Sequence, residues 1–137
     1  MQHFQFQTVG NIISGLGSIS ELKTVLTEKN YKRLLLVTDA GILQQQLHQT
    51  ILEILEQLQL DYAIYSNVQA DPAEQIVLEA VDFVKQKNID VVLGFGGGSA
   101  MDVAKIIAVL SHPEQSQQLS DLYGVGNAQA PRLPLIL

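Results

Sequence analysis

The part of the sequence best suited to chemistry is a cluster of four glycines between a short apolar run and an amphipathic stretch. The cluster follows Val91–Leu93 and consists of Gly94, Gly96, Gly97 and Gly98. Glycine lets a ligand approach the main chain because no Cβ stands in the way. A helix that begins just after such a turn carries free N–H groups at its positive end. The cluster therefore predicts a site for an anionic group, above all a phosphate.

We expect the helix after the glycines to begin at Ser99, because serine is a preferred N-cap. Asp102 stands three residues later, where its carboxylate would complete a capping box. A ligand contact is the alternative role for Asp102, and the two roles are compatible because a cap would hold the loop in shape. Lys105 follows one turn later, and we expect it to pair with Asp102 or to be solvated.

The glycine cluster comes close to known phosphate-binding patterns without matching them. It lacks the Gly-Lys-Ser/Thr ending of the P-loop, and its spacing Gly94-x-Gly96-x-x-Ser99 is one residue away from the dinucleotide fingerprint. A strand-to-helix turn without a ligand is the alternative explanation.

A second carboxylate follows the apolar run Leu34–Val37, at Asp39. At the end of a strand beside the glycine-loop strand, it could accept hydrogen bonds from an adenosine ribose and repel a 2′-phosphate, which selects NAD over NADP. Alternatively, Asp39 caps the helical segment that starts near Ile42. The chemistry alone leaves both interpretations open.

Metal ligation is not indicated by the histidines. His3, His48 and His112 are far apart and share no motif, so we interpret each as a surface or cap residue. The chain has no cysteine, which excludes disulfides and thiolate sites. We therefore predict no catalytic residue and no metal ligand within these 137 residues.

The composition indicates one globular domain whose negative charge disfavours binding to polyanions. The chain is 47% hydrophobic and carries a net charge of −6, which argues against a nucleic acid or an anionic membrane as partner. No apolar stretch approaches 18 residues, and the N-terminus lacks the pattern of a signal peptide. We expect a soluble cytoplasmic protein.

Short apolar runs alternate with helical patterns along the chain. The expected strands are 34–37, 62–65, 90–93 and a last one beginning at 135, and amphipathic stripes predict helices between them. This order predicts a doubly wound α/β fold with a mainly parallel, Rossmann-like sheet, in which Val91–Leu93 is a central strand. Alternation of apolar and polar residues over Phe4–Ile13 predicts an N-terminal β-hairpin.

Three motifs together resemble the iron-dependent (group III) alcohol dehydrogenases, and the resemblance covers the whole chain. They are the signature GGGSAMDVAK at 96–105, Val37-Thr38-Asp39 at a strand end, and Asp71-Pro72-Ala73, where Ala73 departs from the usual threonine. The resemblance implies an enzyme that transfers a hydride between NAD and a small alcohol or aldehyde. It also implies a homodimer.

The resemblance favours the ribose role for Asp39 and implies that Asp71 contacts the nicotinamide side. The pyrophosphate would then be held by Gly96, Gly97, Gly98, Ser99 and Asp102. Together with Asp39 and Asp71, these residues are the expected cofactor-binding set. Members of the family hold Fe²⁺ or Zn²⁺ through one aspartate and three histidines in a C-terminal helical domain. None of those ligands lies in this chain.

Residues 1–137 are thus expected to be the N-terminal dinucleotide-binding domain of a longer protein. The apolar Leu135–Leu137 looks like the start of another core strand, and a domain rarely ends in that way. We expect this piece alone to be inactive.

A module without enzymatic activity is the competing interpretation. An α/β receiver, or another small-ligand-binding module, could accept a phosphoryl group on Asp39. A receiver would also need an acidic pair for Mg²⁺ near its first strand, and the segment 4–13 contains neither Asp nor Glu.

Overall fold

The computed structural model describes residues 9–69 and 73–137 and shows a parallel sheet between two layers of helices. Its strands are β1 (Arg33–Asp39), β2 (Asp61–Val68), β3 (Val91–Gly94) and β4 (Leu135–Ile136), in the order β2-β1-β3-β4. All three strand pairs are parallel. β3 lies between β1 and β4, so the predicted central position of Val91–Leu93 is confirmed.

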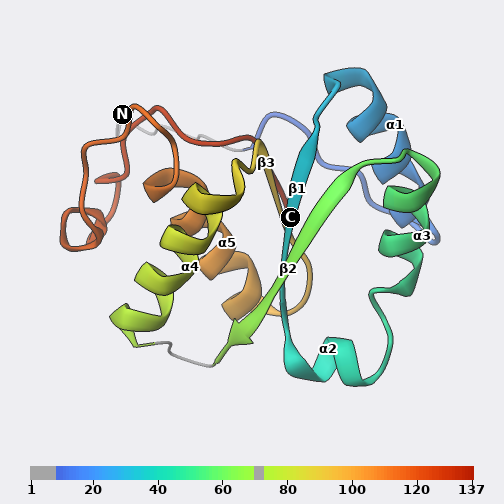
Figure 1. Cartoon of the computed structure of the whole chain (residues 1–137), viewed down its shortest axis with the longest axis horizontal. Helices are drawn as coiled ribbons and strands as arrows, with labels where there is room; N and C mark the ends of the chain where they lie inside the picture. The colour runs from blue at the N-terminus through green and yellow to red at the C-terminus, as the bar shows by residue number, and fades with distance from the viewer. Residues whose placement is uncertain (1–8, 70–72) are drawn as a thin grey trace, which may run out of the picture.

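Figure 1 shows α1 (Glu21–Lys29) and α3 (Gln49–Gln57) on one side of the sheet, with α4 (Glu74–Lys87) and α5 (Gly98–Leu110) on the other. A five-residue helix, α2 (Ala40–Gln44), follows β1 directly. Short 3₁₀ turns, η1 (Ser18–Ser20) and η2 (Leu119–Leu122), complete the elements. Helices on both faces confirm the predicted doubly wound α/β fold.

The strand β1 is central to both halves of the core because its side chains alternate between the two faces. Leu34 and Leu36 pack in the cluster with α1 and α3, whereas Leu35 and Val37 pack in the cluster with α4 and α5. All four are fully buried. Such a continuous apolar run is typical of a strand covered on both faces.

Two helices end at an asparagine, because Asn30 after α1 and Asn88 after α4 both adopt the left-handed conformation of a C-cap. The helical segment expected to start near Ile42 is not continuous. It is divided into α2 and α3 by a turn in which Gln46 has a φ of 58°. The break lets α2 stay at the end of β1 while α3 packs along the sheet.

The predicted N-terminal hairpin is not seen in the part that can be judged. Its first strand, within 1–8, lies outside the described residues. The second, Asn11–Ile13, is neither strand nor helix. Alternation of apolar and polar residues alone does not supply the partner that a strand needs.

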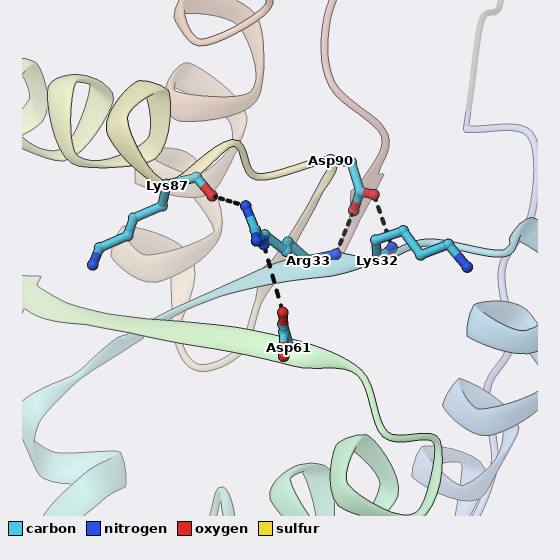
Figure 2. A network of polar contacts seen from close by, with 5 residues as sticks. All are labelled: Lys32, Arg33, Asp61, Lys87 and Asp90. Atoms are coloured by element: carbon cyan, nitrogen blue, oxygen red, sulfur yellow. Dashed lines mark hydrogen bonds and ion pairs between the residues drawn. The ribbon is translucent and has the colours of Figure 1, made fainter.

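The amino end of the sheet is held by a polar network (Figure 2). The carboxylate of Asp90 accepts hydrogen bonds from the backbone N–H groups of Lys32 and Arg33, at 2.8 and 3.0 Å. The Arg33 guanidinium lies 3.6 Å from Asp61 and donates to the carbonyl of Lys87 at 3.4 Å. Asp90 thus ties the start of β3 to the start of β1.

Candidate functional site

The sheet changes direction of winding between β1 and β3. From β1 the chain moves outward to β2, then returns through α4 to β3 on the other side of β1. In open α/β sheets, ligands bind outside the carboxyl ends of the strands at such a switch point. The residues at this point are Asp39 at the end of β1 and the glycines after β3.

The two strand ends lie level with each other. Val37 pairs with Gly94 in the register of β1 and β3, and the N–H of Phe95 donates to the Val37 carbonyl at 2.8 Å. In Figure 1 the connection from β3 to α5 and the helix α2 occupy the same end of the sheet. The fold therefore places Asp39 beside the glycine loop, as the resemblance implied.

Asp39 caps α2. Its Oδ1 accepts a hydrogen bond from the N–H of Ile42 at 3.0 Å. Its other oxygen, Oδ2, faces the loop, because a Cβ added at Gly96 would lie only 3.1 Å from it. The capping interpretation is thus confirmed, and it occupies one oxygen while the second remains beside the predicted ligand site.

Gly96 has a φ of 144°, which side chains other than glycine rarely adopt. A Cβ there would also lie 3.2 Å from the Cβ of Ala100, at the start of α5. Glycine is therefore required at this position by both conformation and space. Its role is to let the loop pass between Asp39 and α5.

The N-terminus of α5 differs from the prediction. Its N-cap is Gly97, with no side-chain cap, and Ser99 lies inside the first turn instead of capping it. The expected capping box is wrong, because Asp102 forms an exposed ion pair with Lys105 at 3.0 Å. That pairing is one of the two alternatives predicted for Lys105.

The uncapped start of α5 is what an anion needs. Within the described residues, the first amide of this helix with an acceptor is that of Met101, which donates to the Gly97 carbonyl at 3.2 Å. Apart from the chain neighbours of each glycine and the backbone of α5 itself, no atom of those residues lies within 4 Å of where a Cβ at Gly97 or Gly98 would stand. Open space in front of free amides fits the pyrophosphate of a dinucleotide.

Asp71 lies outside the described residues, so its predicted contact with the nicotinamide side stays a prediction. The neighbouring helix α4 is held by side chains on both sides of its first turn. Tyr65 of β2 donates its hydroxyl to the Ile76 carbonyl at 2.9 Å, and burial raises the pKa of Tyr65. Tyr123 donates to Glu74 at 2.5 Å, and this bond raises the pKa of Tyr123.

Metal ligands were not expected in this chain, and the described residues bring no three His, Cys, Asp or Glu side chains together. The buried His48 lies before α3 and is not part of the switch point. In the same part of the chain, no helix has the length and apolarity required to span a membrane.

The family model for iron-containing alcohol dehydrogenases matches residues 10–137 of this chain. The chain belongs to this family. Its match to these enzymes lies in their N-terminal portion. The resemblance seen in the motifs is thereby confirmed.

Relatives in the family act on several substrates. The chain is 33% identical to the NAD-dependent methanol dehydrogenase of Bacillus methanolicus, covering 90% of this chain and 32% of that protein. It is 30% identical to the sulfoacetaldehyde reductase of Bilophila wadsworthia, covering 98% and 34%. The chain spans about a third of the length of these curated relatives.

Among solved structures, the fold is similar to NADH-dependent butanol dehydrogenase A of Thermotoga maritima. The TM-score is 0.84 at 26% identity, over 98% of this chain and 34% of that one. The Rossmann-like architecture inferred from the sequence is thus also that of a solved relative.

Sequence reasoning gave the cap near Ile42 as one of two roles for Asp39, but it did not single out Gly41. A signal was present, because an aspartate followed two residues later by glycine at a strand end is compatible with a tight N-cap. What the pattern could not supply is the distance between that glycine and the carboxylate.

Proposed function

We propose that this chain is the NAD-binding portion of a metal-dependent oxidoreductase that acts on a small alcohol or aldehyde. One observation carries the proposal: the Oδ2 of Asp39, which accepts no hydrogen bond from the described residues, lies beside Gly96 and next to the uncapped start of α5. A carboxylate and a set of open amides at the switch point match the ribose and the pyrophosphate of one dinucleotide. NAD supplies the hydride acceptor when it is bound.

Each residue of the site has its own part in this proposal. The amides at the start of α5, at Gly98 and Ser99, would hold the pyrophosphate, while Gly96 and Gly97 keep side chains out of its way. Asp39 would accept hydrogen bonds from the ribose hydroxyls and exclude NADP by repulsion. Asp102 lies further along α5, where it is paired with Lys105. It would contact the ligand only if this ion pair opens.

The proposal places the metal outside this chain. Fe²⁺, or Zn²⁺ in its stead, would be held by ligands in a helical domain beyond residue 137 and would act as a Lewis acid on the substrate oxygen. The 137 residues alone would then bind NAD weakly and lack activity. A homodimer and a cytoplasmic location complete the proposal, to be tested by sedimentation and by cell fractionation.

The full gene product decides between this proposal and the receiver hypothesis. NADH fluorescence should rise when the protein is added, and calorimetry should give a saturable NAD isotherm. Turnover is then sought with NAD, Fe²⁺ and a panel of short alcohols. The result that contradicts the proposal is absence of NAD binding together with Mg²⁺-dependent labelling of Asp39 by a small phosphodonor, which a receiver would show.

A further inference from the structure

The carboxylate of Asp39 lies between two glycines. A Cβ added at Gly41 would stand 3.0 Å from Oδ1, the oxygen that accepts the Ile42 amide. A Cβ added at Gly96 would stand 3.1 Å from Oδ2. Both distances are shorter than ordinary van der Waals contact, so each oxygen occupies space that a side chain would need.

Gly41 is not required by its own backbone. It lies in the first turn of α2, and its φ is outside the left-handed region, so any residue could adopt its conformation. Alanine is the better helix former at such a position. The contact that a methyl group would make is with Asp39, which indicates that the carboxylate is the reason for a glycine here.

We propose that Gly41 is a positioning residue for Asp39. The missing side chain lets Oδ1 reach the Ile42 amide while Oδ2 stays turned toward Gly96. This inference rests on the proposed function in one respect, which is that Asp39 binds the ribose of NAD. A methyl group at Gly41 displaces Oδ1 by a few tenths of an ångström, and Oδ2 moves with it because the carboxylate is rigid.

The test is a double-mutant cycle in the full gene product with Gly41→Ala, Asp39→Ala and the combined variant. Gly41→Ala should weaken NAD binding roughly fivefold, the factor that corresponds to the loss of one hydrogen bond. NADP gains no hydrogen bond from the carboxylate, so its affinity should stay the same. The ratio of NAD affinity to NADP affinity should therefore fall by the same factor as the NAD affinity itself. In the Asp39→Ala background, Gly41→Ala should change neither affinity.

Thermal unfolding gives a second cycle that needs no cofactor. With Asp39→Ala present, Gly41→Ala should raise Tm because helix propensity improves and no carboxylate is crowded. With Asp39 intact, the contact opposes that gain and Tm should not rise. Gly10→Ala is the matched control, because Gly10 is exposed and no described atom lies within 4 Å of its Cβ position.

The outcomes separate the two proposals. An equal loss of NAD affinity from Gly41→Ala in both backgrounds overturns the positioning role, because the methyl group would then act on the ligand directly. An equal rise of Tm in both backgrounds overturns it as well. If the unmodified protein fails to bind NAD, the proposed function fails, and the Tm cycle still decides whether Gly41 positions Asp39.

Discussion

Two carboxylates at opposite ends of the same sheet are used in different ways. Asp90, at the amino end, has both oxygens bound by the backbone amides of Lys32 and Arg33 (Figure 2). Asp39, at the carboxyl end, uses one oxygen as a helix cap and, within the described residues, has no donor on the other. A carboxylate with both oxygens on backbone amides serves the fold, whereas one with a free oxygen beside a glycine loop can also recognise a ligand.

The surroundings of the two carboxylates also differ in how many polar groups already have partners. At the amino end, a cavity of about 350 Å³ is lined by Arg33 and Asp61, which already pair with each other. At the carboxyl end, the amides before Met101 and the space at Gly97 are open. The cavity at the amino end is lined by groups that already have partners, whereas the unpaired hydrogen-bonding groups favour the carboxyl end as the proposed site.

The largest expected effect comes from Gly97→Val, which should abolish NAD binding with little loss of stability. Apart from its chain neighbours, no described atom lies within 4 Å of the Cβ position at Gly97, so the branched side chain fits the fold and fills the space proposed for the pyrophosphate. Calorimetry with NAD measures the loss, and Gly10→Val is the control. Equal affinity in variant and wild type would refute the phosphate site.

Asp90→Ala should cost about 2 kcal/mol of unfolding free energy, because two charge-assisted hydrogen bonds to backbone amides are lost at once. Urea denaturation measures the change. NAD affinity should be unaffected, since the residue lies at the other end of the sheet. A variant as stable as wild type would remove the basis for calling Asp90 structural.

Asp39→Gly should raise NADP affinity at least about tenfold, because a negative charge no longer faces the 2′-phosphate. The variant should also lose about 1 kcal/mol of stability with the cap on Ile42. Parallel titrations with NAD and NADP, followed by denaturation, separate the two effects. Unchanged rejection of NADP with reduced stability would mean that Asp39 is only a cap.

The smallest effect is expected for Asp61→Asn, which removes the ion pair with Arg33. The two side chains are 48% and 77% exposed, so solvent already screens the pair. The unfolding free energy should change by less than about 0.5 kcal/mol. A larger loss in urea denaturation would show that the whole network at the amino end acts as one unit.

Much of the fold could be predicted from local patterns. The run Leu34–Val37 identifies a strand because burial on both faces calls for continuous apolar residues. The stripe of α4 identifies a helix because burial on one face repeats with the helical period. The hairpin expected around Asn11–Ile13 could not be predicted reliably from such a local pattern. A strand is defined by its partner, and short alternation does not specify one.

The site shows the same division between local and distant information. Gly96 and Asp39 could be chosen as candidates from residue type and position, although the pattern at Asp39 is equally compatible with a helix cap. The helix start at Gly97 was missed, since Ser99 is the better cap by preference. The actual geometry leaves Ser99 in the first turn and gives Asp102 to Lys105.

The sequence by itself predicted an anion site at the glycine cluster and determined which segments fill the core, because glycine spacing and hydrophobic period act over short distances. Only the structure showed that Asp39 and Gly96 lie side by side and that a Cβ at Gly41 would crowd the Asp39 carboxylate. The first of these depends on the order β2-β1-β3-β4, which brings strand ends more than fifty residues apart to one edge. A distance between such segments is set by sheet pairing and core packing, which no local pattern records.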